Sequence, residues 1–232
     1  MLRLITDFDG PIIDVSERYY RVYQFCLEKT RRRDQDVKQL EKAEFWRLKR
    51  SRVSEQEIGT LSGLDAEQAQ VFSQLRRQTV HTQPYFEYDT LAPTAVAALE
   101  KVQQAGIDLA VLTMRRVREL EFAFNQHNLA RFFPKNRCFC LSNDYVKTRD
   151  VDDKPLLMAR ALAELPPAEH TWMVGDTEAD TIAAKTHNVK VMGVLSGIRD
   201  RAQLELHQPD LIVKDLREAV EFIQSQSWQQ VS

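Results

Sequence analysis

Apolar and polar positions follow two different patterns along this chain. The first is a short strand pattern at residues 2–6. The run ends on Asp7 and Asp9, followed by Gly10 and Pro11. Buried strands disfavour Asp, and Gly-Pro turns the chain, so we predict that the strand stops here. Carboxylates at i and i+2 point to the same side of an extended backbone, so the charges of Asp7 and Asp9 are expected to crowd one region. Either solvation in a turn or a bound divalent cation would make that crowding tolerable.

The second pattern is helical and extends from residue 16 to about residue 83. Strand patterns are almost absent from this stretch. Apolar residues recur one helical turn apart, as at Val22 and Cys26. Ser54 and Asp65 stand where helix N-caps are expected. We predict three or four helices joined by short loops.

From Pro93 onward, helical and strand patterns alternate along the chain. Strands are predicted at 107–112, 137–141, 171–174, 189–194 and 211–213, and helices at 94–104, up to about 125, 155–164 and 177–187. Such alternation predicts an α/β fold, a parallel sheet with helices on both faces. The helical stretch is therefore expected to be an insertion after the first strand. The predicted domains are an α/β core of residues 1–15 and 90–232 and a helical domain of residues 16–89.

The composition is that of an ordinary soluble globular protein, with 43% hydrophobic and 28% charged residues. A formal net charge of -2 indicates no general affinity for nucleic acid or for anionic membranes. No apolar run approaches the roughly 20 residues that span a bilayer, and early acids interrupt any signal-peptide pattern. We expect a cytoplasmic protein with neither nucleic acid nor membrane as partner. The sequence carries no signal of oligomeric state.

Cysteine usage is sparse and odd in number, with Cys26, Cys138 and Cys140. The spacing Cys138-x-Cys140 is too short for a usual zinc site. We interpret it as one face of a buried strand. Such usage is consistent with a reducing compartment.

Polar residues gather where the predicted strands end. They comprise three carboxylates, a hydroxyl, an ammonium and a further acid one helical turn on: Asp7, Asp9, Asp176, Thr113, Lys154 and Asp180. Each has an ordinary explanation alone, such as a helix cap, a solvated helix start or a strand-end residue. The carboxyl ends of parallel strands share one edge and bind ligands there, so together these residues predict a binding crevice.

Four segments carry a family resemblance. The segment 7–10 after an apolar strand resembles motif one of the haloacid dehalogenase-like (HAD) hydrolase superfamily. Leu112-Thr113 resembles its motif two, Lys154-Pro155 its motif three and the segment 175–180 its motif four. The match spans nearly the whole chain, and the segments 183–194 and 197–204 are also similar to the phosphoglycolate phosphatase-like branch. The resemblance implies a doubly wound, Rossmann-like core with a helical cap domain.

The resemblance also implies a reaction. It implies a Mg²⁺-dependent phosphatase that acts on a small phosphorylated metabolite, with Asp7 as the nucleophile that forms an aspartyl-phosphate. Asp9 would act as general acid and then as general base. Thr113 and Lys154 would act on the phosphoryl oxygens and complete the catalytic set.

The remaining assignments also follow from the resemblance. The implied Mg²⁺ ligands are the side chain of Asp7, the main-chain carbonyl of Asp9 and the side chain of Asp176, with Asp180 orienting them. Phosphate binding is expected at Thr113, Lys154 and Gly10. Arg115 stands where related sequences commonly have a small polar residue; we count it as a substrate-binding candidate beside the ordinary interpretation of Arg115 and Arg116 as a solvated helix start. Pro11 and Met114 depart from the family pattern and leave the surroundings of the substrate open.

Other functions remain compatible with these residues. One alternative is a phosphomutase, which uses the same catalytic residues. A dehalogenase is disfavoured, because the second acid, Asp9, suits phosphoryl transfer better than dehalogenation. A receiver-type signalling domain or a catalytically silent binding protein would keep the fold without turnover. The long helical insertion and the intact catalytic residues favour the phosphatase. The substrate itself has no motif in the sequence.

Overall fold

The computed structural model describes residues 1–229, which divide into two compact units. The sheet unit comprises Met1–Asp14, Leu91–Gly197 and the chain from Arg201 onward. The helical unit comprises Val15–Thr90 together with Ile198–Asp200. Each unit is described separately below.

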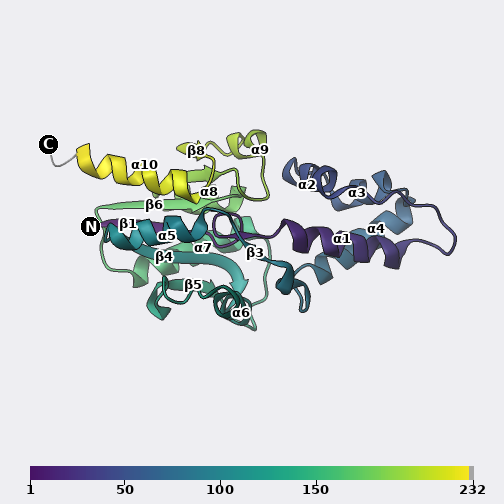
Figure 1. Cartoon of the computed structure of the whole chain (residues 1–232), viewed down its shortest axis with the longest axis horizontal. Helices are drawn as coiled ribbons and strands as arrows, with labels where there is room; N and C mark the ends of the chain where they lie inside the picture. Colours follow the sequence, from purple (N-terminus) through teal and green to yellow (C-terminus); the bar gives the residue numbers. More distant parts are fainter. Residues whose placement is uncertain (230–232) are drawn as a thin grey trace. The chain divides into compact units, whose positions relative to one another are not determined.

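Within residues 1–229, six parallel strands form the main sheet of the sheet unit, in the order β5-β4-β1-β6-β7-β8 (Figure 1). The strands are β1 (Leu2–Thr6), β4 (Asp108–Arg116), β5 (Cys138–Leu141), β6 (His170–Gly175), β7 (Lys190–Val194) and β8 (Leu211–Val213). This confirms the predicted parallel sheet. The short strands β2 (Ile13–Asp14) and β3 (Thr90–Leu91), which the sequence did not predict, pair with each other.

Strand β1 lies at the centre and fixes where the chemistry can occur. It pairs with β4 on one side and β6 on the other, so that Thr6 is level with Val111 and Val174. The main-chain N–H of Asp7 donates to the carbonyl of Val174 at 2.7 Å and extends this ladder by one residue. The ends of β1 and β6 therefore lie side by side.

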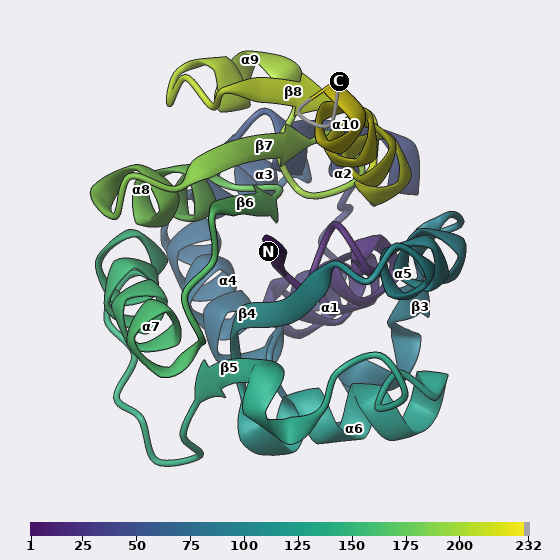
Figure 2. The same cartoon turned by 90° about the vertical axis from the view of Figure 1, so that its left-hand side faces the viewer.

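Helices cover both faces of the sheet (Figure 2). Helices α7 (Asp150–Glu164) and α8 (Glu178–Thr186) pack on one face, and α5 (Ala95–Gln104), α6 (Val117–His127) and α10 (Leu216–Gln229) lie on the other. The short helices η2 (Lys135–Arg137) and α9 (Arg201–Glu205) complete the unit. Its core contains fully or nearly fully buried apolar residues from strands and helices, including Ile5, Ala110, Leu112, Phe139, Met158, Met173 and Val191.

The first turn of α7 differs from the sequence prediction. We expected this helix to begin at Pro155, but it begins at Asp150 and includes Lys154 and Pro155. Asp153 accepts hydrogen bonds from the main-chain N–H and the hydroxyl of Thr148, at 2.7 and 2.9 Å. Acids in a first turn also interact favourably with the helix dipole, so the helix starts earlier than proline alone indicates.

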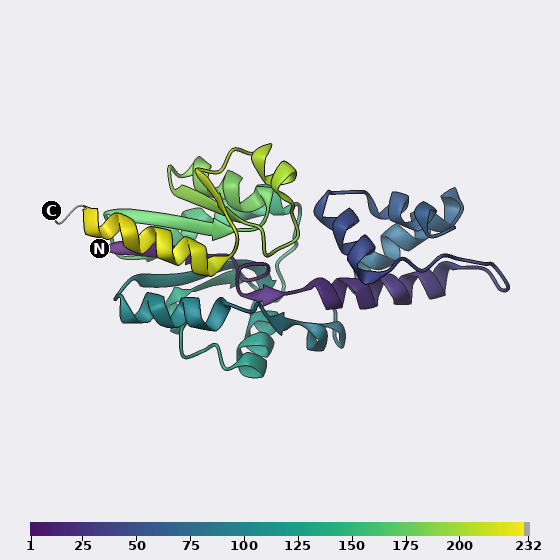
Figure 3. The same cartoon turned by 45° about the horizontal axis from the view of Figure 1, so that its top comes forward.

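The helical unit contains, among the described residues, four α-helices: α1 (Ser16–Thr30), α2 (Lys42–Arg50), α3 (Glu55–Leu61) and α4 (Ala66–Thr79), with the short helix η1 (Tyr85–Tyr88). Figure 3 shows α1, in purple, continuing into the loop that leads to α2. Ser54 and Asp65 are the N-caps of α3 and α4, as predicted. No helix in the described part of the chain is both long and apolar enough to cross a membrane.

Candidate active site

Three buried acids meet at the carboxyl edge of the sheet, and we call them the acid cluster: Asp7, Asp176 and Asp180. Carboxylate oxygens of the three residues lie within 4.8 Å of one another. Asp7 follows β1, Asp176 follows β6, and Asp180 lies in the first turn of α8. The predicted convergence of these strand ends is therefore present.

Glycines make room for this cluster. A Cβ atom at Gly10 would lie 2.4 Å from Cγ of Asp176, and one at Gly197 would lie 1.9 Å from Oδ2 of the same residue. A Cβ atom at Gly175 would lie 2.0 Å from Cγ of Asp180. Gly10 also has a φ of +91°, which L side chains rarely adopt. The acids are thus held where any larger residue in these loops would displace them.

Lys154 lies among the acids. Its side chain is 2% exposed, and its Nζ is 3.0 Å from Oδ2 of Asp7 and 2.5 Å from Oδ1 of Asp180. The other oxygen of Asp180, Oδ2, accepts hydrogen bonds from the main-chain N–H and the hydroxyl of Thr177, at 3.0 and 2.7 Å. Asp180 therefore caps α8 and positions Lys154 at the same time.

The electrostatics of the cluster follow from burial and charge crowding. Burial raises the pKa of Asp7 well above its usual value; Lys154 opposes this rise, and the neighbouring acids add to it. Burial would lower the pKa of Lys154, but Asp180 and Asp7 outweigh it and the pKa is raised. The ammonium group therefore stays charged, and the carboxylates near it remain electrostatically crowded.

The acid cluster fits a metal ion. Its donors are carboxylate oxygens, the ligands that hard divalent cations prefer. With all three carboxylates ionised, the cluster and the ammonium group of Lys154 carry a formal net charge of -2, which equals in size the charge of one divalent cation. The glycines at positions 10 and 197 keep Asp176 free of steric obstruction from its neighbours. The acid cluster could therefore hold a divalent metal ion.

The carboxylate of Asp9 is not part of the acid cluster, although its charge is near enough to help raise the pKa of Asp7. The strand ends at Thr6, and the chain then turns so that the N–H groups of Ile12 and Ile13 donate to the carbonyl of Phe8. Because the backbone is no longer extended, the alternation of side chains does not apply. The carboxylate of Asp9 instead contacts Arg115, whose Nη2 is 2.6 Å from Oδ1.

The remaining predicted residues lie on β4 and in the first loop. Thr113 is buried, and its hydroxyl oxygen accepts a hydrogen bond of 3.2 Å from the main-chain N–H of Arg115. The pairing of β4 with β5 shifts register between Leu112 and Arg116. Thr113 and Arg115 therefore lie on an irregular stretch of β4. Gly10 lies beside Asp176. Their contacts with a phosphate, and that of Arg115, stay predictions.

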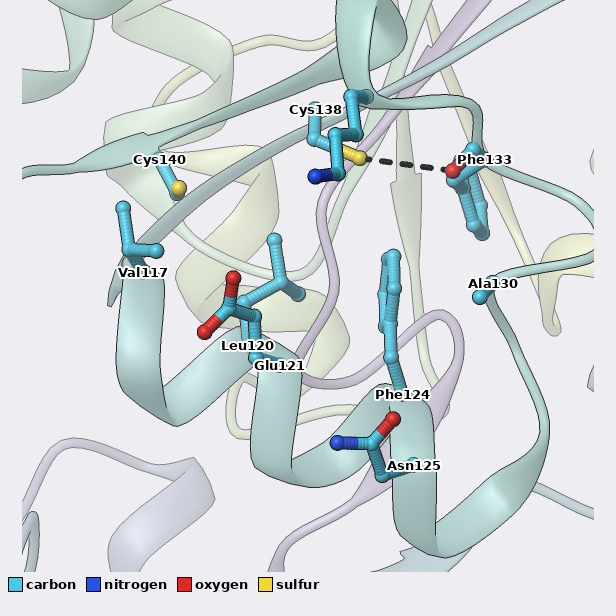
Figure 4. A pocket seen from close by; sticks show the side chains of 10 residues that line it. Val117, Leu120, Glu121, Phe124, Asn125, Ala130, Phe133, Cys138 and Cys140 are labelled. Atoms are coloured by element: carbon cyan, nitrogen blue, oxygen red, sulfur yellow. Dashed lines mark hydrogen bonds between the residues drawn. The ribbon is translucent and has the colours of Figure 1, made fainter.

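Two of the cysteines, Cys138 and Cys140, line a pocket whose walls include none of the three acids. Figure 4 shows Cys138 and Cys140 of β5 on one side of a pocket of about 470 Å³, whose other walls include Phe124 and Phe133. Burial raises the pKa of Cys138 to about 11 and also raises that of Cys140, so both stay protonated near neutral pH. The interpretation as one face of a strand is confirmed.

Sequence reasoning missed two features of the site. It did not assign Gly175 and Gly197 a role beside the acids, although a glycine at the end of a strand, directly before Asp176, is a usable signal. It also did not pair Arg115 with Asp9, because nothing in the spacing of the two residues indicates that contact.

Comparisons with known proteins agree with this geometry. A family model described as haloacid dehalogenase-like hydrolase matches residues 3–188. The pyrophosphatase PpaX of Oceanobacillus iheyensis is 24% identical over 134 residues, which cover 58% of this chain and 60% of that protein. A probable phosphoglycolate phosphatase of Pseudomonas putida is 24% identical over 131 residues, covering 56% of this chain and 50% of its own length. The matched segment thus spans about half or slightly more of these relatives.

Solved structures share the fold over nearly the full length. A predicted phosphatase from Clostridium acetobutylicum has a TM-score of 0.69 at 18% identity, covering 97% of this chain and 98% of its own. A haloacid dehalogenase-like family protein from Streptococcus pneumoniae has a TM-score of 0.66 at 17% identity, covering 96% and 98%. With the family model matching most of the sequence, this chain belongs to the haloacid dehalogenase-like hydrolase family.

Proposed function

We propose that this chain is a Mg²⁺-dependent phosphatase that hydrolyses a small phosphorylated metabolite through an aspartyl-phosphate on Asp7. The observation that carries the proposal is the acid cluster around Lys154 at the carboxyl edge of the sheet. The names of the relatives, a pyrophosphatase and a phosphoglycolate phosphatase, support the same reaction class. Hydrolysis of a phosphate monoester requires acceleration by up to about 10²¹-fold, so the site must act on both the nucleophile and the leaving group.

Asp7 is the proposed nucleophile because its carboxylate is fixed in orientation. Its Oδ1 accepts a hydrogen bond of 2.7 Å from the main-chain N–H of Phe8, and its Oδ2 contacts Lys154. In the first step, an oxygen of Asp7 forms a bond to phosphorus while the bond from phosphorus to the leaving oxygen breaks. The covalent intermediate divides one slow hydrolysis into two faster steps.

Asp9 is the proposed general acid and base. In the first step its carboxyl group gives a proton to the leaving oxygen, and the departing alcohol is neutral. In the second step its carboxylate takes a proton from water as the water oxygen bonds to phosphorus and the bond to Asp7 breaks. General acid–base catalysis of this kind contributes about 10²- to 10⁴-fold.

The proposed ligands of Mg²⁺ are the carboxylates of Asp7 and Asp176 and the main-chain carbonyl of Asp9. Asp180 is a positioning residue here, because its oxygens already contact Thr177 and Lys154. The ion, when bound, supplies positive charge against the phosphoryl oxygens and the carboxylate nucleophile. The two negative charges in excess around Lys154 support a divalent cation.

Thr113, Lys154 and Gly10 are proposed to contact the transferred phosphoryl group. The hydroxyl oxygen of Thr113 accepts from Arg115, so its own hydrogen is directed elsewhere and can be donated. Lys154 offers a charged donor that burial strengthens. At Gly10 the missing side chain lets a phosphate approach the backbone.

The helical unit is proposed to be the cap domain of the family and to take part in substrate selection. It contains a buried group of charges from three helices, with Glu55 contacting Lys49 and, at 2.8 Å, Arg76. Burial and the charge of Arg76 lower the pKa of Lys49 to about 8. Two cations beside one anion give this group a net positive charge, which suits an anionic substrate.

A phosphate-release screen tests the proposed function. Wild-type protein is assayed on metabolite phosphates, including phosphoglycolate and pyrophosphate, with Mg²⁺ and with EDTA. We expect release that depends on Mg²⁺ and a fall of at least about 10⁴-fold in Asp7→Asn, as for loss of other catalytic nucleophiles. Asp108→Asn, which removes a partly buried acid at the other edge of the sheet, is the matched control and should keep the rate per folded molecule.

Two results would contradict the proposal: Asp7→Asn with wild-type activity, or wild-type protein that releases no phosphate from any substrate with Mg²⁺. Isomerisation of a sugar phosphate without net release would instead indicate the phosphomutase alternative. Lasting phosphorylation of Asp7 without turnover would indicate a receiver-type function.

A further inference from the structure

Arg115 contacts a predicted catalytic residue rather than solvent. Its Nε and Nη2 lie 2.8 and 2.6 Å from the same oxygen, Oδ1 of Asp9. The side chain of Arg115 is 2% exposed, whereas that of Asp9 is 24% exposed. The buried guanidinium group of Arg115 therefore contacts a carboxylate, that of Asp9, which is partly exposed to solvent.

The guanidinium group of Arg115 is restrained by its surroundings. Its Cζ lies 5.0 Å from the ring centroid of Phe8, which is fully buried. Phe8 in turn packs at 5.8 Å against Phe124, one wall of the pocket in Figure 4. The main-chain N–H of Arg115 donates to Thr113 on the irregular stretch of β4. Arg115 is thus held by its backbone and by one aromatic face.

Asp9 belongs to a turn rather than to a strand. It lies beyond the end of β1 and makes an isolated bridge with Ile13. A carboxylate in a loop rotates about two side-chain bonds, and proton transfer requires a defined position. Two N–H groups of the planar guanidinium converge on Oδ1 and hold this oxygen of Asp9 at a defined distance.

We propose that Arg115 is a positioning residue that holds the carboxyl group of Asp9 in place for proton transfer to the leaving oxygen. The inference rests on the proposed phosphatase function. In this arrangement Arg115 anchors Oδ1, and the carboxyl group of Asp9 carries the proton that it gives up. The proton moves to the leaving oxygen as its bond to phosphorus breaks, and the electron pair of that bond stays on the oxygen.

The leaving group provides the test, because esters differ in their need for a proton. The p-nitrophenolate ion departs without one, whereas an alkoxide does not. We compare kcat/KM for p-nitrophenyl phosphate and for an alkyl phosphate, since kcat/KM reports the steps through departure of the leaving group. In Arg115→Gln, kcat/KM should fall about 100-fold for the alkyl ester and less than about fivefold for p-nitrophenyl phosphate.

A second variant and a matched control complete the test. Arg115→Lys keeps the charge without the planar fork, so we expect a selective loss of about tenfold on the alkyl ester. Arg3→Gln removes a buried arginine that pairs with Asp108 at the other edge of the sheet, and should leave the ratio of the two substrates unchanged.

Several results would overturn the inference. An equal fall for both esters in Arg115→Gln, with a raised KM, would show that Arg115 binds the phosphate itself. An unchanged ratio in Arg115→Lys would contradict the inference even if the Gln variant does not fold. Failure of the proposed function is a different result, in which wild-type protein hydrolyses neither ester with Mg²⁺.

Discussion

The two edges of the six-stranded sheet carry buried charges in opposite balance. At the amino edge, Asp108 lies between Arg3 and Arg137, whose Nε atoms are each 2.7 Å from one of its oxygens. At the carboxyl edge, the acid cluster surrounds the ammonium group of Lys154. In these groups, positive charge exceeds negative by one at the amino edge, and negative exceeds positive by two at the carboxyl edge.

The pKa values of the acids show what this difference means. Burial opposes ionisation of Asp108, but hydrogen bonds from Arg137 and Arg3 outweigh it and lower its pKa. At Asp7, burial raises the pKa and the neighbouring acids add to that rise. The ion pairs of the amino edge satisfy their carboxylate, whereas the carboxyl edge keeps an imbalance that a bound cation would remove. Perturbed groups of the second kind are typical of functional sites.

The largest effect on activity is expected from Lys154→Met, which removes the positive charge from the carboxyl edge. Three crowded carboxylates would lose the cation that contacts Asp7 and Asp180. We expect the phosphatase rate to fall by at least about 10³-fold, and the free energy of unfolding to fall by about 3–5 kcal/mol without metal. Added Mg²⁺ should recover more of this free energy in the variant than it adds to wild type.

Lys147→Met is the control for that variant. Lys147 pairs with Asp150 at the start of α7, where the carboxylate is half exposed. Exposed pairs contribute about 0–1 kcal/mol, so stability and rate should change little. Urea unfolding with and without Mg²⁺ measures both variants. Equal losses in the two would contradict the special position of Lys154.

A smaller effect on the rate is expected from Gly197→Ala, which disturbs the carboxyl edge without changing its charge. The new Cβ would lie 1.9 Å from Oδ2 and 2.3 Å from Cγ of Asp176, so that side chain must move. We expect the rate to fall about 100-fold, because misplacing a catalytic group by about 1 Å can cost that much. A steady-state assay at saturating Mg²⁺ measures it.

Gly106→Ala separates the two consequences of adding a methyl group. Gly106 has a φ of +64°, and apart from Gly106 itself and its two chain neighbours no residue has a heavy atom within 4 Å of the position of its Cβ. The backbone strain should cost about 1 kcal/mol of unfolding free energy with no change in rate. A Gly197→Ala protein that keeps the wild-type rate would show that Asp176 needs no exact placement.

The convergence of the acids at the carboxyl edge was predictable from the sequence because these acids come after strands. Asp7 and Asp176 each come directly after an apolar run, and parallel strands bring such positions together. The parallel sheet and its strand positions were also predictable, since apolar runs alternate with helical patterns. Residue spacing within single elements was sufficient for these predictions.

The rest depends on contacts between distant segments, which spacing does not encode. The pair of Arg115 and Asp9 forms because β1 gives way to a turn and β4 loses its regular register. The closeness of Gly197 to Asp176 depends on how the loop after β7 returns to β6. The early start of α7 at Asp150 depends on hydrogen bonds to Asp153 from the preceding loop. Each of these features requires the fold to be known first.

The smallest effect on the rate, and a clear effect on stability, is expected from Asp108→Asn at the amino edge. Removing this carboxylate leaves Arg3 and Arg137 without it, which should lower the free energy of unfolding by about 3 kcal/mol near neutral pH. Because its pKa is lowered in the folded state, Asp108 stabilises the protein above its unfolded pKa of about 3.9. That stabilisation is lost as the pH falls through the folded pKa.

The stability gap between wild type and Asp108→Asn should therefore narrow as the pH falls below the unfolded pKa of about 3.9. Urea unfolding of both proteins near neutral pH and again at about pH 3 measures the gap, and the comparison cancels other groups that titrate in both proteins. A gap that stays constant would mean that Asp108 stabilises the fold as a hydrogen-bond acceptor rather than as a charge. A parallel fall in catalytic rate would mean that the two edges are coupled, contrary to the division of roles that their charges indicate.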